Sequence, residues 1–253
     1  MLIERFQRAA FVAVLMGALG ACAAEGTGEG FAKTDPYEAT NRSVLKGNIR
    51  VDRYVLRPAA QAYDFVAPTL VKHLIGNGIS HLDLVNDFAN YALQGDVERG
   101  LTTLGRFTLN TVLGAGGLLD PATEFGLSKE GTDFGLTLGV WGVGEGPYLV
   151  LPFLGPSTLR DAAGFLVDRG LSPTAYLGPL DAPDLLGPAL TGIEFVDLRD
   201  RNKDIIDDVL YESVDPYVTI RAGYLQRRRA LIAGDEGVEE TLPDIFDDEQ
   251  SEQ

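Results

Sequence analysis

The sequence of 253 residues has few of the residue types on which disulfides, metal sites and nucleic-acid binding depend. Its single cysteine cannot form an internal disulfide, which excludes a small disulfide-built domain. His73 and His81 lie eight residues apart and match no strong zinc pattern, so we predict no metal site. The formal net charge is −16 and no basic run is longer than residues 227–229. This excludes a nucleic-acid partner, because binding phosphates requires a basic face.

The motifs of common enzymes are absent as well. No G-x-S-x-G motif occurs, so the sequence gives no support for a lipase built on a nucleophile elbow. Ser157, in the stretch GPSTLRD, is better explained as a helix cap. The glycines of residues 142–146 are followed by Pro147 and are not flanked by a strand and a helix, which argues against dinucleotide binding. We therefore predict no enzymatic activity and no cofactor, with a catalytic group assembled from distant residues as the alternative.

The first 22 residues are typical of an exported lipoprotein. Arg5 and Arg8 precede an apolar run, residues 9–19, that is too short to span a bilayer but fits a secretory signal. The run ends in Leu-Gly-Ala-Cys, which resembles a lipobox, so we predict a signal peptide over residues 1–21 and a lipid anchor on Cys22. A diacylglycerol and an acyl chain on this residue would suffice for stable anchoring. The alternative is a chance cysteine after an ordinary signal.

Two further features of this region predict where the protein resides. Residue 23 is alanine rather than the aspartate that retains enterobacterial lipoproteins at the inner membrane, so we predict an outer-membrane protein that faces the periplasm. Residues 22–34 are small, polar and rich in glycine, and we predict that they form a flexible tether.

The body of the chain, residues 35–233, is predicted to be mainly helical. In residues 77–94 an apolar stripe that includes Val85 and Phe88 alternates with a polar face at helical spacing, and residues 97–113 repeat the pattern. Few segments alternate with the period of a strand. Further helices are predicted over residues 156–169, 193–210 and 215–232.

Residues 134–156 form the most unusual stretch of the sequence, since they carry one charge, Glu145, with six glycines and three prolines. The prolines exclude a membrane-spanning helix. The stretch fits either a soluble core loop or a membrane-seated helical body in which irregular backbone lines a water-filled channel. Trp141 and Tyr148 would suit the headgroup level. The channel or loop candidates are Phe134, Gly135, Trp141, Gly142, Gly144, Gly146, Pro147 and Tyr148.

The last twenty residues, 234–253, hold nine acidic residues and no basic one, which predicts a disordered tail. Within this tail, Leu242, Ile245 and Phe246 form a small apolar group among carboxylates. We interpret the group either as part of a solvated tail or as a short docking motif for a partner with a basic rim.

Several motifs together resemble the MlaA (VacJ) family of lipoproteins. They are DPYEATNR at 35–42, RPAAQAYDFVAP at 57–68, NDFANYALQGD at 86–96, GRFTLNTVLGAGGLLDPA at 105–122, DFGLTLGVWGVGEGPYLVLPFLGPSTLRD at 133–161 and DPYVTIRAGYLQRRR at 215–229. They follow the family's order and cover nearly all of the predicted body. One departure is Leu136, where the family carries glutamine.

The resemblance implies a fold and a function. It implies a ring of largely horizontal amphipathic helices around a channel, seated in the inner leaflet of the outer membrane. It implies association with a trimeric porin and removal of phospholipids that have strayed into the outer leaflet. These would pass to the periplasmic lipid-binding protein MlaC, which maintains lipid asymmetry. The alternatives are an anchored scaffold that braces a porin without transport, or an enzyme that cleaves phospholipids.

Three arginines are candidates for contact with a lipid phosphate, because a guanidinium matches phosphate geometry. The alternative for Arg160 is a local structural pair with Asp161. The candidates are Arg160, Arg106 and Arg221.

Overall fold

The computed structural model describes residues 35–172 and 186–241. The predicted signal peptide (1–21), the anchor Cys22, the tether (22–34) and the tail group of Leu242, Ile245 and Phe246 lie outside the described residues. The described residues are mainly helical, which confirms the predicted fold class.

The described part of the chain forms helices, two π-helical turns and one pair of strands. They are α2 (Glu38–Val51), the π-helical turn η1 (Asp52–Leu56), α3 (Arg57–Val66), α4 (Thr69–Gln94), α5 (Val97–Val112), α6 (Pro121–Glu124), α7 (Phe134–Val140), β1 (Tyr148–Leu151), β2 (Gly155–Thr158), α8 (Leu159–Leu171), α9 (Leu186–Arg201), α10 (Lys203–Asp207), the π-helical turn η3 (Asp208–Glu212) and α11 (Pro216–Thr241).

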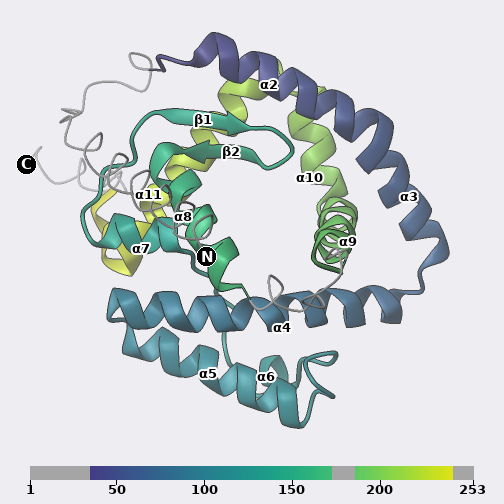
Figure 1. Cartoon of the computed structure of the whole chain (residues 1–253), viewed down its shortest axis with the longest axis vertical. Coiled ribbons are helices and arrows are strands. Elements are labelled where there is room, and N and C mark those ends of the chain that lie inside the picture. The colour runs from purple at the N-terminus through teal and green to yellow at the C-terminus, as the bar shows by residue number, and fades with distance from the viewer. Residues whose placement is uncertain (1–34, 173–185, 242–253) are drawn as a thin grey trace, which may run out of the picture.

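The elements close into a ring (Figure 1). The nearly continuous helix from α2 to α3 forms one side of the ring and α4 forms the opposite side. Helix α9 contacts both α3 and α4 and so closes one end. At the other end α7 joins α4 to α8 and α11, while the β1–β2 hairpin contacts α2. Helix α5 packs along the outside of α4.

The corner between α4 and α5 is encoded by two adjacent residues. Gly95 ends α4 in the left-handed conformation (φ 77°), which glycine adopts without steric cost. Asp96 then caps α5 by accepting a hydrogen bond from the Arg99 amide at 3.0 Å. The chain therefore turns back on itself, and α5 covers one flank of α4.

The β1–β2 hairpin was not predicted, and two asparagines of α2 hold it in place. Strand β1 pairs with β2 on one edge, and its other edge faces α2. Asn41 accepts from the Val150 amide and donates to the Tyr148 carbonyl, both at 2.9 Å. Seven residues further along α2, Asn48 donates to the Leu151 carbonyl and accepts from the Phe153 amide, again at 2.9 Å. The side-chain amides thus satisfy backbone groups that a third strand would otherwise bond.

Several expected helices differ in their bounds from the observed ones. The helix predicted from residue 156 begins at Leu159, because residues 155–158 form β2. Ser157, the predicted cap, lies in that strand. The cap is Thr158, which accepts a hydrogen bond from the Asp161 amide at 3.2 Å. The helix predicted over residues 193–210 is divided at Asn202, where the chain leaves the helical conformation between α9 and α10. The last helix continues to Thr241 with a non-helical conformation at Gly234.

Candidate functional site

Helices α4 and α5 bury polar faces and expose apolar ones. Among the described residues, buried polar and charged side chains outnumber buried apolar ones. On α5, Thr103, Arg106 and Asn110 are buried, whereas Leu101 and Val112 are 61% and 73% exposed. A contiguous exposed apolar face of this kind requires an apolar medium or a partner to cover it.

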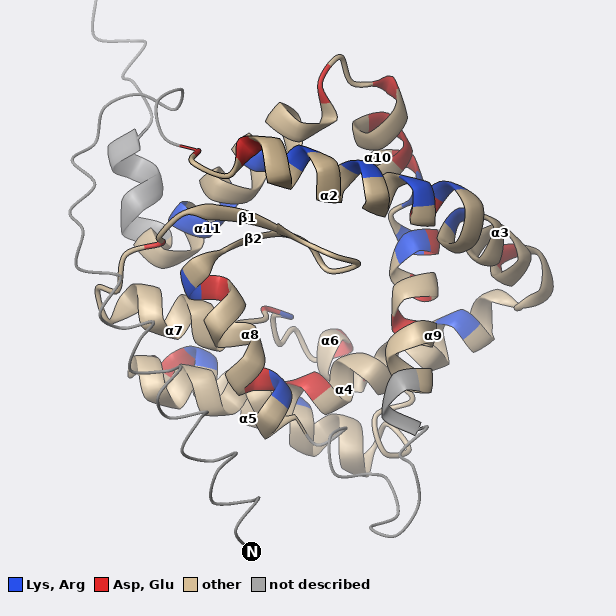
Figure 2. Ribbon diagram, turned by 45° about the horizontal axis from the view of Figure 1, so that its top comes forward, with Lys and Arg blue, Asp and Glu red and all other residues tan. Residues whose placement is uncertain are grey.

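The same inversion occurs on α4. The apolar stripe predicted there includes Val85 and Phe88, which are exposed, while Asp87 and Asn90 of the predicted polar face are buried. The periodicity therefore identifies the helix correctly, but the face toward the protein is the polar one. Figure 2 shows charged residues distributed along the helices of the ring, with long stretches of α4 and α5 that carry none.

Arg106, a candidate for phosphate contact, is instead enclosed within the protein. It is 3% exposed, and its Nη2 donates to both oxygens of Asp120 at 2.9 and 2.7 Å. Its Nη1 donates to the Leu127 carbonyl at 2.6 Å. Asn110 joins this cluster by donating to Asp120 at 2.8 Å. These bonds attach α5 to the segment around α6.

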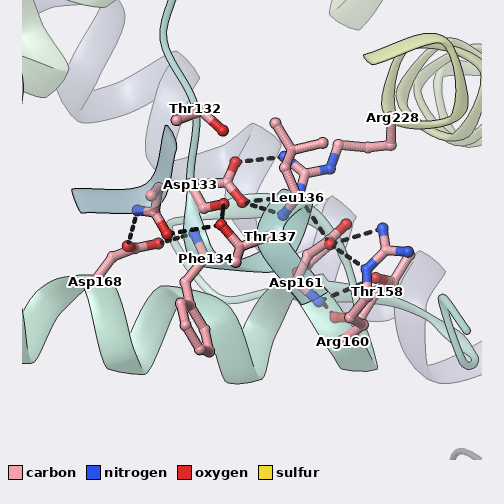
Figure 3. A network of polar contacts seen from close by, with 12 residues as sticks. Thr132, Asp133, Phe134, Leu136, Thr137, Thr158, Arg160, Asp161, Asp168 and Arg228 are labelled. Carbon is pink, nitrogen blue, oxygen red and sulfur yellow. Dashed lines mark hydrogen bonds and ion pairs between the residues drawn. The ribbon is translucent and has the colours of Figure 1, made fainter. Parts of the chain in front are cut away.

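A second buried polar cluster holds the start of the glycine-rich segment (Figure 3). Asp133 caps α7 by accepting from the Leu136 amide at 2.8 Å and also accepts from Arg228 of α11 at 2.9 Å. Arg228 donates to Asp161 of α8, also at 2.9 Å. Arg160 donates to the same Asp161 oxygen at 3.0 Å, which confirms the local pair. Three helices are thereby joined at two carboxylates.

Further bonds connect α7 to α4 and α8. The side chain of Asp168 on α8 accepts from the Phe134 amide at 2.8 Å and from Asn90 of α4 at 2.9 Å. Asn90 in turn accepts from the Thr137 hydroxyl at 2.9 Å. Gln94, at the end of α4, donates to Thr137 at 2.9 Å. Satisfied networks of this kind fix one arrangement of the helices around them.

Two of the candidate glycines have structural roles. A Cβ on Gly135 would lie 2.7 Å from Asp161 Oδ1, and a Cβ on Gly164 of α8 would lie 2.3 Å from the Gly135 amide nitrogen. Because Gly135 and Gly164 have no side chains, α7 and α8 can cross in direct contact. Gly142 has φ 86°, and its amide donates to the Gly139 carbonyl at 2.9 Å, so it ends α7 as a left-handed cap with open space around it.

The other candidates of this stretch divide between surface and core. Trp141 is 53% exposed, makes an edge contact with Phe134 and donates from Nε1 to the Leu93 carbonyl at 3.0 Å. Gly144 and Gly146 are exposed, and Pro147 is half-buried beside them. Tyr148, expected at the headgroup level, is instead buried in the apolar core. The reason is that its strand packs between α2 and α11, where its ring contacts those of Tyr217 and Tyr224.

Of the other two arginine candidates, Arg160 is buried and Arg221 is half-buried. Arg160 is 5% exposed, and besides Asp161 it reaches the Val143 carbonyl at 3.3 Å. Arg221 lies 3.7 Å from Asp35 and faces the Tyr148 ring. These guanidiniums serve to join elements of the fold.

An amphipathic cavity of about 460 Å³ lies among α4, α8, α9 and the tip of the hairpin. None of the eight channel candidates and none of the three arginine candidates is among the described residues that line it. Leu154, from the turn of the hairpin, is the one lining residue that belongs to the stretch of residues 134–156. The lining residues are Ile79, Leu82, Asp83, Asn86, Leu154, Phe165, Asp168, Arg169, Ser172, Leu190, Thr191, Glu194, Phe195 and Leu198.

The charges of this cavity come from three helices. Asp83 lies on α4, Asp168 and Arg169 on α8, and Glu194 on α9. Surrounding protein raises the pKa of Asp83, and the positive charge of Lys129 partly opposes this. The pKa of Glu194 is raised by burial first and by the charge of Asp83 second, while Arg169 lowers it. The cavity is thus a mostly apolar space with a few charged groups, as ligand sites are.

The charged groups of the cavity were missed at the level of sequence. Asp83, Arg169 and Glu194 belong to three helices that are distant in the chain, and no local motif joins them. The one signal available was the polar face of residues 77–94, which includes Asp83.

No group of three side chains suited to holding a metal ion is found in the part of the chain that the structure describes. No helix in the ranges 35–172 and 186–241 is both long and apolar enough to cross a membrane.

Known proteins share the family and the fold of this chain. The family described as MlaA lipoprotein matches residues 33–231. The intermembrane phospholipid transport system lipoprotein MlaA of Escherichia coli (strain K12) is 38% identical over 220 residues, which cover 85% of this chain and 84% of that protein. The protein of the same name from Haemophilus influenzae is 33% identical, covering 84% of this chain and 85% of its own length.

A solved structure also resembles this chain. Its description is "Structural basis for maintenance of bacterial outer membrane lipid asymmetry". It superposes with a TM-score of 0.70 at 35% identity and covers 79% of this chain and 100% of its own.

Proposed function

Because the chain belongs to the MlaA lipoprotein family, we propose that it removes misplaced phospholipids from the outer leaflet of the outer membrane through the cavity among α4, α8 and α9. The lipids then pass to a periplasmic carrier, and the asymmetry of the membrane is maintained. The observation that carries the proposal is the inverted polarity of α4 and α5, which expose apolar side chains and bury polar ones, next to an amphipathic cavity that α4 lines.

Inverted polarity fits the chemistry of lipid passage. A phospholipid that leaves a leaflet needs polar groups for its headgroup and apolar cover for its tails. The cavity offers both, since Leu82 and Phe165 lie beside Asp83 and Asn86. The exposed faces of α4 and α5 suit a position in the leaflet itself, where amphipathic helices lie along the interface. Trp141, with an exposed ring, suits the headgroup level.

The proposal includes a lipid anchor and two partners. Diacylglycerol and an acyl chain on Cys22 hold the ring at the periplasmic face of the outer membrane. A trimeric porin surrounds or supports the ring, and a periplasmic lipid-binding protein of the MlaC type receives the lipid. The glycine-rich segment after α7 contributes the loop at the channel mouth.

The experiment that tests the function measures phospholipid in the outer leaflet of intact cells. Cells that lack the gene should accumulate phospholipid there, wild-type protein should reverse the accumulation, and Cys22→Ala protein should not. Equal rescue by the unanchored protein would overturn the membrane-seated conduit. No accumulation in the deletion strain would favour a scaffold, and lyso-lipid generated by purified protein would favour an enzyme.

The acidic tail is proposed to dock the periplasmic carrier through Leu242, Ile245 and Phe246. Truncation after Thr241 spares α11 and removes these three residues. The truncated protein should bind the carrier more weakly, and the difference should shrink as salt rises, because carboxylate-driven docking is screened. Unchanged affinity at low salt would eliminate the docking role.

A further inference from the structure

We propose that the cavity among α4, α8 and α9 selects phospholipids whose headgroup carries an ammonium, with Asp83 and Glu194 contacting the ammonium and Arg169 the phosphate. The inference rests on the proposed function and adds a headgroup preference and the residues that set it. It predicts that zwitterionic lipids such as phosphatidylethanolamine are favoured over anionic lipids such as phosphatidylglycerol.

The first support is that Asp83 on α4 and Glu194 on α9 line the same cavity. Both line the cavity, and the charge of Asp83 acts on Glu194. Among the described residues, neither carboxylate makes a hydrogen bond or an ion pair. Other carboxylates of the ring differ: Asp52 is paired with Arg199, and Asp161 with Arg228. Both residues are exposed, and an ammonium between α4 and α9 would take the place of water as the hydrogen-bond donor to their carboxylates.

The second support is the position of Arg169. Its Nη2 donates to the Thr191 hydroxyl on α9 at 3.2 Å, which brings the guanidinium to that helix. Thr191 precedes Glu194 by three residues, so the two lie on one face of α9. The hydrogen bond to Thr191 uses one of the five N–H donors of a guanidinium, whose planar shape suits a phosphate. A cationic group therefore lies one helical turn from the carboxylate, as the two charges of a zwitterionic headgroup require.

The third support is the balance of charge and apolar cover. Three carboxylates, Asp83, Asp168 and Glu194, share the cavity with one arginine. Asp168 already accepts two hydrogen bonds from the protein, which leaves Asp83 and Glu194 for a ligand. A headgroup with a phosphate and no cation would meet net repulsion here, whereas an ammonium relieves it. Apolar side chains such as Leu82 and Phe165 cover the acyl chains nearby.

The test compares which lipids the purified full-length protein retains from an equimolar mixture of phosphatidylethanolamine and phosphatidylglycerol, quantified by mass spectrometry. Wild-type protein should be enriched in phosphatidylethanolamine. The double variant Asp83→Asn/Glu194→Gln should lose this enrichment, by about three- to tenfold, because each contact is open to solvent and thus modest. Arg169→Gln should lower retention of both lipids and leave their ratio nearly unchanged.

A matched control neutralises one aspartate and one glutamate outside the cavity. Asp204→Asn/Glu212→Gln changes the net charge equally, on exposed residues of α10 and η3. The control should keep the wild-type ratio. Loss of enrichment in the control as well, or no enrichment in wild-type protein that does retain lipid, overturns the headgroup preference alone. Wild-type protein that retains neither lipid overturns the conduit itself together with the preference.

Discussion

Replacing Asp87 by asparagine is expected to stabilise the folded protein at alkaline pH. Asp87 is 8% exposed on α4, and its Oδ1 accepts from the Thr132 amide at 3.0 Å. Burial raises its pKa from 3.8 to about 7, and the nearby charges of Asp83, Asp133 and Asp168 contribute. The Thr132 hydrogen bond opposes the rise without cancelling it. Ionised Asp87 therefore costs the fold free energy that an asparagine would not.

The sign and size of this effect follow from proton linkage. Between pH 4 and pH 7 the folded state holds a proton on Asp87 that the unfolded state has lost, so the stability of the wild-type protein falls as pH rises through this window. Below the unfolded pKa both states are protonated and the penalty is absent. A shift of about three pKa units corresponds to at most about 4 kcal/mol at 1.36 kcal/mol per unit. We expect Asp87→Asn to gain about 2–4 kcal/mol at pH 8 and little at pH 4.

The assay is urea unfolding followed by circular dichroism at pH 4, 6 and 8, with Asp204→Asn as an exposed control. The difference between Asp87→Asn and wild-type protein should grow with pH, while the control should track the wild type. An Asp87→Asn protein that is less stable than wild type at pH 8, with an unchanged pH slope, would refute the reasoning, because it would mean that the carboxylate is stabilised by its surroundings.

Two substitutions test the glycine-rich segment. Gly135→Ala should lower the Tm, because the added Cβ would lie 2.7 Å from Asp161 Oδ1 where α7 crosses α8. A Tm equal to that of the wild type would show that the two helices can separate at no cost in stability. Gly142→Leu should cost about 1–2 kcal/mol in unfolding free energy, because leucine is strained at a positive φ even in open space. It should also impair removal of outer-leaflet phospholipid while the protein stays anchored, and full removal activity would exclude Gly142 from the channel mouth.

The sequence predicted the helical class and most helix positions because apolar periodicity is a local property. It could not predict which face of a helix, the apolar or the polar one, packs against the rest of the protein. Periodicity indicates two faces, and the assumption that the apolar one turns inward fails here: Leu101 is exposed and Asn110 is buried. The proposed seat in a membrane leaflet accounts for the reversal, because apolar side chains that face lipid need no cover from the protein.

The hairpin escaped prediction for a different reason. Strands of four residues are too short to show alternation, and β2 contains Pro156. The backbone groups on the free edge of β1 are satisfied by Asn41 and Asn48, which lie about a hundred residues earlier in the chain. Such a partnership has no local signature.

The arginines show where residue type alone misleads. A guanidinium suits a carboxylate as well as a phosphate. Arg106 pairs with Asp120 and Arg160 pairs with Asp161, and both arginines are buried. Only the assembled ring shows that Arg169 is the arginine that lines the cavity. The charged part of the site could therefore be assigned only after α4, α8 and α9 were placed side by side.

The most direct test of the conduit is to fill the cavity and measure phospholipid in the outer leaflet. Leu82→Trp/Leu190→Trp places two large side chains among α4, α8 and α9, and Leu101→Trp/Leu104→Trp adds the same bulk on the exposed face of α5. In cells that lack the wild-type gene, at equal protein level and anchoring, the cavity variant should leave phospholipid in the outer leaflet, and the control should clear it. Full clearance by the cavity variant would contradict passage of lipid through this cavity.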